Sequence, residues 1–139
     1  DRYTDRGKEM DGWETRRRRD PGYDFCIVRL GVPGIIRGVI VDTAFFRGNF
    51  PAECSLEGAL VEGYPSEEEL VSEAIAWTEV VPKSALKGDS KNPFVVKSTY
   101  AFNYVRLNIF PDGGVARLRV HGEPVIRFGR LPRFSKASA

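Results

Sequence analysis

The stretch MDGWETRRRR, Met10 to Arg19, brings two acids, a tryptophan and four consecutive arginines together. Carboxylates transfer protons as general acids or bases, and guanidinium groups bind carboxylates through paired hydrogen bonds. Asp11 and Glu14 are therefore candidate acid–base groups. Because side chains alternate in direction along an extended chain, Arg16 and Arg18 share one side and are candidate anion ligands. The arginine run is also typical of a solvated basic patch.

A second group of polar residues lies in FNYVRLNIFPDGGVARLRVHG, where Asp112-Gly113 separates two β-like runs. An Asp-Gly dipeptide in this setting predicts a β-hairpin with Phe110 facing Val115. One face of the hairpin then holds an uninterrupted apolar ladder, which we expect to be core. Its pairs are Val105 with Val120, Leu107 with Leu118, and Ile109 with Ala116.

The other face of this predicted hairpin is basic. Arg106 lies opposite Arg119, and Tyr104 lies opposite His121. Like charges directly opposite one another destabilise a sheet by up to about 1 kcal/mol, so we expect an anion nearby. Either a carboxylate of the protein supplies it, or Arg106, Arg117 and Arg119 hold an anionic ligand.

The elements that position these residues are predicted to be β-strands. Residues 1–24 are polar and predict an arm with at most one short strand, residues 25–125 predict a β-rich module, and residues 126–139 predict a basic tail. Strand-like runs separated by turns, including GVPG, predict an all-β antiparallel sandwich or jelly roll. Ser66, followed by three glutamates, has the form of a capping box and predicts one short helix ending near Ala76.

Composition limits the classes of function. The 21 basic and 19 acidic residues give a net charge of +2, which does not by itself indicate nucleic-acid binding. No apolar run approaches the roughly 18 residues of a membrane span, so we expect no membrane partner. Cys26 and Cys54 lie in apolar runs and predict buried thiols in place of a disulfide. These thiols and the lack of a visible signal peptide predict an intracellular, cytoplasmic location, with a peroxisomal one left open.

The longest motifs resemble those of allantoicases. The similar stretches are MDGWETRRRRDPGYDFCIVRLGVPGIIRGVIVDTAFFRGNFPAECSLEG, WTEVVPKSALKGDS and VRLNIFPDGGVARLRVHGEP, in one collinear order over roughly residues 7–125. The resemblance implies a galactose-binding-like jelly roll that hydrolyses allantoate to ureidoglycolate and urea in purine (allantoin) degradation. Allantoicases look like two tandem modules, and this chain resembles the first module without its opening segment. The resemblance therefore implies a homo-oligomer, or pairing with a second allantoicase module.

The implied reaction sets requirements on the residues. The substrate carboxylate must be anchored, the departing urea nitrogen protonated and a water activated. Acids or a histidine suit the proton transfers, and the catalytic candidates are Asp11, Glu14, Asp112 and His121. Arginines and an amide suit binding, and the substrate-binding candidates are Arg16, Arg18, Asn49, Arg106, Arg117 and Arg119. Asp112 serves equally well as a turn residue, His121 as a satisfied sheet histidine, and Asn49 or Asp42 as loop-ordering groups.

The sequence departs from the family pattern at one place. Where allantoicases tend to have Thr-His before VRLNIFPDGG, this chain has Asn103 and Tyr104. In the predicted hairpin His121 lies opposite Tyr104, so an imidazole would return to the same place from the neighbouring strand. Whether that imidazole replaces the family's histidine is left open.

Two questions stay open at this level. Scattered carboxylates and one histidine could supply a site for Mn²⁺ or another divalent cation, but no ligand spacing specifies one, so no metal ligand is assigned. The rival function is a noncatalytic jelly-roll module that binds a small anion, sugar or protein through the arginine-rich face. A nucleic-acid contact through the arginine run ranks last because the chain lacks the exposed aromatic platform of single-strand binders.

Overall fold

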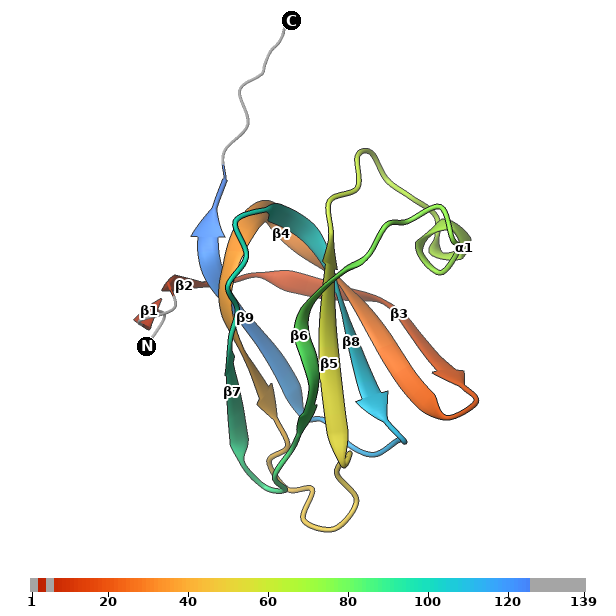
Figure 1. Ribbon diagram of the computed structural model, residues 1–139, viewed down its shortest axis with the longest axis vertical. Coiled ribbons are helices and arrows are strands. Elements are labelled where there is room, and N and C mark those ends of the chain that lie inside the picture. Colours follow the sequence, from red (N-terminus) through yellow and green to blue (C-terminus); the bar gives the residue numbers. More distant parts are fainter. Residues whose placement is uncertain (1–2, 5–6, 126–139) are drawn as a thin grey trace, which may run out of the picture.

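The computed structural model describes residues 3–4 and 7–125, with residues 3–4 and 16–20 described by their backbone only (Figure 1). Its described part contains nine strands and one short helix. All of its strand pairs are antiparallel, which confirms the predicted all-β jelly-roll sandwich. The elements are β1 (Tyr3–Thr4), β2 (Gly7–Met10), β3 (Gly12–Asp20), β4 (Tyr23–Asp42), β5 (Glu53–Ala59), α1 (Glu67–Leu70), β6 (Thr78–Ala85), β7 (Lys91–Val95), β8 (Ala101–Phe110) and β9 (Arg117–Pro124).

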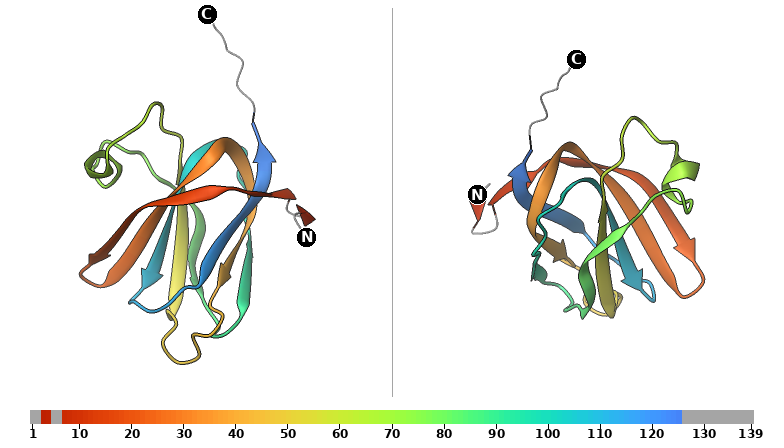
Figure 2. Two further views of the ribbon diagram at one scale, coloured as in Figure 1. Left: turned by 180° about the vertical axis from the view of Figure 1, so that it is seen from behind. Right: turned by 45° about the horizontal axis from the view of Figure 1, so that its top comes forward.

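The long strand β4 joins the two layers of the sandwich. Its first half pairs with β3 and β8, and its second half pairs with β9 and β7 (Figures 1 and 2). The register with β8 shifts between Arg29 and Gly34, where the chain passes through GVPG. The prediction of a turn at GVPG is therefore wrong, because the strand bends there and continues into the other sheet.

The core lies between the two sheets. Its buried residues include Val105 and Leu107 of β8, Val120 of β9 and Leu56 of β5. These side chains alternate with outward-facing ones, as expected for strands that bury one face. The apolar faces of β8 and β9 are thus core, as the sequence predicts.

The predicted hairpin between β8 and β9 is wrong. The two strands lie in different layers, since β8 pairs with β4 and β5 while β9 pairs with β4 and β2. Residues 111–116 cross between the layers and are tied to the 42–50 loop, where the Gly114 N–H donates to the Asn49 carbonyl at 2.8 Å. Gly113 has φ of 126°, and a Cβ there would come within 2.7 Å of the Phe50 carbonyl carbon. The glycine therefore serves a close approach of two loops. Val105 and Val120 both belong to the core but do not pair with each other in a ladder.

The prediction for the N-terminal segment is also wrong in part. Residues 12–20 are not a loop but strand β3, which pairs along β4 around the Pro21-Gly22 turn. Before it, β2 pairs with β9. The predicted boundary after residue 24 stays a prediction, although the hairpin formed by β3 and β4 spans it. The predicted tail, 126–139, lies outside the described residues.

The predicted capping box is confirmed, but the helix is shorter than predicted. The Glu69 N–H donates to the Ser66 hydroxyl, and the Ser66 N–H donates to the Glu69 carboxylate. Helix α1 ends at Leu70 because the Ser72 hydroxyl forms hydrogen bonds that compete with the helix. It donates to the Glu69 carbonyl and accepts from the Ala74 N–H. Residues 60–77 around this helix cover the outer face of β4 and β8, where Leu70 is buried.

The predictions for the cysteines and for membrane-spanning segments can be compared with the structure. In the described part of the chain, Cys54 is buried, Cys26 is half-buried, and the two form no disulfide. Burial raises the pKa of the Cys54 thiol from 9.0 to about 11. No helix among the described residues is long and apolar enough to cross a membrane.

Candidate functional site

The arginine-rich face predicted from the hairpin is divided between the two sheets. Arg106 projects from the outer face of β8, because its neighbours Val105 and Leu107 point into the core. Arg117 and Arg119 project from the outer face of β9, because Val120 points inward. Arg106 and Arg119 are therefore not opposite each other, and the proposed repulsion between them does not exist.

On its own face, Arg106 lies in a satisfied network. Its Nε is 3.0 Å from a Glu57 carboxylate oxygen and donates to the Asn108 side-chain carbonyl at 3.2 Å. The guanidinium carbon lies 4.8 Å from the centroid of the Phe25 ring and 5.7 Å from that of Trp77. The protein itself supplies the carboxylate here, so Arg106 has a structural role in this face.

The register brings two other predicted ligands close to this face. Arg16 pairs with Ile27, which also pairs with Arg106, and Arg18 pairs with Phe25. The side chains of Arg16 and Arg18 lie outside the described part of the chain. Their predicted role in substrate binding therefore stays a prediction.

The outer face of β9 gathers the second set of charged residues. Arg117 Nη2 donates to a Glu9 carboxylate oxygen at 3.1 Å, and Glu9 of β2 pairs directly with His121. Arg119 lies between Arg117 and His121 on the same face, because every second residue of a strand projects to the same side. Two guanidinium groups, a carboxylate and an imidazole thus occur together, and we call Glu9, Arg117, Arg119 and His121 the β9 cluster.

The exposure of these groups differs. The Arg117 side chain is 57% exposed and that of Glu9 is 16% exposed, whereas His121 as a residue is 2% exposed. The Nε of Arg119 is buried and has no hydrogen-bond partner in the described structure. Burying a guanidinium N–H without a partner costs about 1–3 kcal/mol. A buried donor left without a partner is typical of a site that binds a ligand. The β9 cluster is therefore the best candidate for binding an anion.

Sequence reasoning missed Glu9. It lies in the segment predicted to be an arm, and nothing in GKEM marks it as chemical. Only the pairing of β2 with β9 brings it opposite His121. In the structure Met10 is buried and Glu9, its neighbour on β2, projects to the opposite side.

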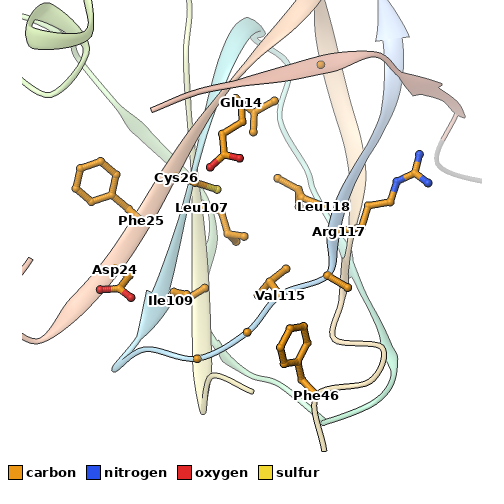
Figure 3. Close-up of a pocket in the computed structure, with 15 residues that line it drawn as sticks. Glu14, Asp24, Phe25, Cys26, Phe46, Leu107, Ile109, Val115, Arg117 and Leu118 are labelled. Atoms are coloured by element: carbon orange, nitrogen blue, oxygen red, sulfur yellow. The ribbon is translucent and has the colours of Figure 1, made fainter. Parts of the chain in front are cut away.

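The predicted acid Glu14 lies in a different place, in a pocket of about 580 Å³ between the two sheets. Figure 3 shows its carboxylate directed into this pocket, above the apolar side chains of Leu107 and Val115. Asp24 and Arg117 also line the pocket. The described walls are largely apolar and carry two carboxylates, so among the described residues the β9 cluster is the better candidate for binding an anion.

The remaining predicted residues do not join either place. Asp11 is exposed where β2 passes into β3, and its carbonyl accepts from the Gly31 N–H at 2.9 Å. Asp112 is exposed in the loop between the layers. Asn49 is exposed and uses its backbone carbonyl to order the same loop, while the Asp42 carboxylate accepts from the Ala44 N–H at 2.9 Å. Asp42 therefore orders its loop.

Asn103 and Tyr104, the two residues where a departure from the family is expected, have structural roles. The Asn103 side chain exchanges two hydrogen bonds of 2.8 Å with the backbone of Val61. Tyr104 is buried with Phe25 and Leu70. It pairs with Arg29 and Ala59 and not with His121, so the idea that His121 returns an imidazole to this place is wrong.

The described donors do not fit a metal ion. No group of three or more histidine, cysteine, aspartate or glutamate side chains in residues 7–15 and 21–125 lies close enough to hold one. The β9 cluster offers one carboxylate and one imidazole beside two permanent cations, which repel a divalent metal. No step of the chemistry below depends on a metal.

The chain is similar to known allantoicases in sequence. The family model for the allantoicase repeat matches residues 1–125. Probable allantoicases from Ralstonia nicotianae and Streptomyces coelicolor are 50% identical over 126 residues and 49% identical over 130 residues. These alignments cover 90% and 86% of this chain but 36% and 35% of the relatives, so the chain spans about a third of their length.

The structure leads to the same group of proteins. The crystal structure of an allantoicase from Saccharomyces cerevisiae is 38% identical, with a TM-score of 0.61. The match covers 80% of this chain and 31% of that protein. Since the family model matches all of the described residues and describes a single repeat, the chain belongs to the allantoicase family and carries one allantoicase module.

Proposed function

We propose that this chain acts in allantoin degradation as a module of an enzyme that hydrolyses allantoate to ureidoglycolate and urea. The observation that carries the proposal is the match of the allantoicase repeat to residues 1–125. The β9 cluster supports it because it combines anion-binding and proton-transferring groups on one face. Arg106 lies on the other sheet and is paired with Glu57, so the proposal does not place it in this site.

The first requirement is to anchor the substrate carboxylate. The buried, unpartnered Nε of Arg119 is the donor that a carboxylate would satisfy. Arg117 adds a second cation that is more than half exposed and therefore accessible to a dissolved substrate. A guanidinium binds a carboxylate through two parallel hydrogen bonds, which fixes its orientation as well as its position.

The second requirement is to move protons. Hydrolysis breaks the bond between the central carbon and one ureido nitrogen, and forms a bond from that carbon to a water oxygen. The water loses a proton and the departing nitrogen gains one. Glu9 is the group that can accept a proton at the surface of the cluster, and His121, directly opposite it, is the second candidate carrier.

Urea release tests the proposal. The 139-residue chain would be incubated with allantoate, with and without Mn²⁺, and urea measured by a coupled urease assay. Arg119→Met removes the proposed anchor, and Arg47→Ala removes an arginine that is 84% exposed and pairs with Asp89. We expect urea from the native chain and from Arg47→Ala, with a loss of about 100-fold or more in Arg119→Met.

Calorimetric binding of allantoate distinguishes the alternatives. Binding without urea release, lost in Arg119→Met, would mean that the module binds substrate but needs further groups from a second module. This would favour the noncatalytic binding function for the isolated chain. Unchanged binding or turnover in Arg119→Met would show that the β9 cluster is not the substrate site.

A further inference from the structure

Exposed apolar side chains gather at the end of the sandwich where β4 bends and β5 ends (Figure 1). Two of them are aromatic: Trp13 at the start of β3 is 58% exposed, and Tyr64 in the loop after β5 is 86% exposed. Val32 in the bend of β4 and Leu60 just after β5 are about half exposed. Isolated exposed apolar residues are common on soluble proteins, but a contiguous group of them is typical of an interaction surface.

The two aromatic residues meet at one arginine. Trp13 pairs directly with Arg29 of β4, so their side chains lie on the same face of the sheet. The guanidinium carbon of Arg29 lies 5.2 Å from the centroid of the Tyr64 ring. A Cβ at Gly31 would come within 3.4 Å of the Trp13 ring, so the indole also reaches the bend that contains Val32. Tryptophan, tyrosine and arginine are the residues that most often dominate the binding energy of protein interfaces.

This surface also carries charges of both signs that do not pair with one another. Arg29 contacts the Tyr64 ring and forms no ion pair with a described residue. The carboxylates of Asp11 and Glu62 have no partner among the described residues either. Asp11 lies opposite Gly31, whose N–H donates to its carbonyl, and Glu62 lies two residues before Tyr64. One cation and two acids therefore lie around one apolar centre.

We propose that this surface binds the same surface on a second copy of the chain, which gives a symmetric dimer. A two-fold axis places one surface against its copy, so that every contact is made twice. The aromatic centres, Trp13 and Tyr64, then cover each other and are removed from water. Arg29 of each copy pairs with the acids of the other copy, Asp11 and Glu62, so that all of these charges gain partners.

The charges favour a second copy over other occupants. An acidic partner would satisfy Arg29 but would be repelled by Asp11 and Glu62, and a basic partner would have the reverse effect. A purely apolar partner would bury these charges without partners, which is costly. Only a surface with both signs satisfies all of them. A stable interface has about 20–30 residues on each side, so this smaller surface should give a weak dimer, with a dissociation constant above about 1 μM.

Sedimentation equilibrium of the 139-residue chain tests the dimer at concentrations from about 10 μM to 1 mM. The mass of the native protein should rise with concentration from that of one copy to that of two. Trp13→Ala should weaken association at least about tenfold, because it removes half of the aromatic centre. Phe45→Ala is the matched control, since it removes a ring that is 88% exposed in the 42–50 loop, and it should leave association unchanged. Circular dichroism checks that both variants are folded.

Reversing the charges tests the reciprocal pairing. Arg29→Glu leaves only acids on the surface, and the double variant Asp11→Lys, Glu62→Lys leaves only cations, so each should be monomeric alone. An equal mixture of the two should dimerise, because acids again meet cations at every pair. If Trp13→Ala fails to fold, this mixture decides. A monomer up to roughly 1 mM, equal weakening by Trp13→Ala and Phe45→Ala, or a mixture that stays monomeric while the native chain dimerises would overturn the proposal.

Discussion

The outer faces of the two sheets both present arginines, but the arginines do different things. On the β8 face, Arg106 is 19% exposed, bound to a carboxylate and enclosed by aromatic rings. On the β9 face, Arg117 is 57% exposed and Arg119 has a buried donor without a partner. On the first face Arg106 is paired with Glu57 and lies under residues 60–77, whereas on the second face Arg117 and Arg119 share one described acid, Glu9.

The difference shows that the role of an arginine on a strand can be assigned only when its surrounding residues are known. Arg106 stabilises the fold because its partners are already in place. The β9 cluster is incompletely satisfied, and incomplete satisfaction in a folded protein commonly marks a place where a ligand completes the structure. Variants on the β8 face should therefore change mainly stability, and variants on the β9 face should change mainly ligand binding.

The largest effect is expected on the β8 face. Arg106→Ala leaves the Glu57 carboxylate and the Asn108 amide without their cation and removes the contact with Phe25. Breaking a well-buried pair costs about 3–5 kcal/mol, and partial exposure reduces this to roughly 2–4 kcal/mol of unfolding free energy. Urea denaturation followed by circular dichroism measures it.

Arg117→Ala is the matched control for that experiment. It breaks an ion pair of similar length, 3.1 Å, but the arginine is mostly exposed. We expect a loss below about 1 kcal/mol. Equal destabilisation by Arg106→Ala and Arg117→Ala would contradict the distinction between the faces. The double variant Arg106→Met, Glu57→Met should recover most of the stability because no charge is left buried.

A smaller effect on stability is expected from Cys54, in the sheet beneath the β8 face. Cys54 lies on β5, and burial raises its pKa from 9.0 in the ordinary thiol to about 11. The folded state therefore keeps the proton to a higher pH than the unfolded state does. The stability associated with this proton is fully present below pH 9 and is lost as the pH rises toward 11, by about 2 kcal/mol.

The Cys54→Ala variant isolates this contribution. The measured quantity is the difference in pH dependence between the native chain and the variant, because every other titratable group is common to both. The variant should lose less stability between pH 9 and 11. Identical profiles would mean that burial does not raise the pKa of the Cys54 thiol. Arginine variants on either face should be compared below pH 9, where the thiol does not contribute.

A still smaller change in unfolding free energy, of opposite sign, is expected for a variant on the β9 face. Arg119→Met replaces a buried donor without a partner by an apolar side chain of similar length. The unfolding free energy should stay unchanged or rise by about 1 kcal/mol, while allantoate binding falls. Thermal unfolding with and without allantoate measures both. A destabilised Arg119→Met that still binds allantoate would reverse the roles assigned to the two faces.

The sequence predicts the interior of this fold better than its connections. Alternation correctly marks Val105, Leu107 and Val120 as core, because a strand that buries one face must alternate whichever strand it meets. The same alternation cannot say whether β8 and β9 pair or face each other across the sandwich. The Asp112-Gly113 dipeptide suggested pairing, but its glycine is needed for a close approach to Phe50.

The candidate site follows the same rule. Arg117, Arg119 and His121 occur together because they alternate on one strand, which the sequence shows. Glu9 joins them only because β2 pairs with β9, a contact between residues more than a hundred positions apart. Local motifs carry no information on such pairings, and for that reason Arg106 was placed with the wrong partners.

The smallest predicted effect concerns what covers the β8 face. Ser66→Ala removes the hydroxyl that accepts from the Glu69 N–H at 3.1 Å and so opens the capping box of α1. The loss should be about 0.5 kcal/mol, since the helix is one turn long and exposed apart from Leu70. Hydrogen exchange should increase at residues 67–71 and leave β9 unchanged. A matched change of the same type, Ser98→Ala, lies outside this cover and should not alter exchange at residues 67–71. If Ser66→Ala also exposed Trp77 to a fluorescence quencher, the cover over Arg106 would depend on this cap; if it did not, packing of Leu70 against Phe25 and Tyr104 alone would hold it in place.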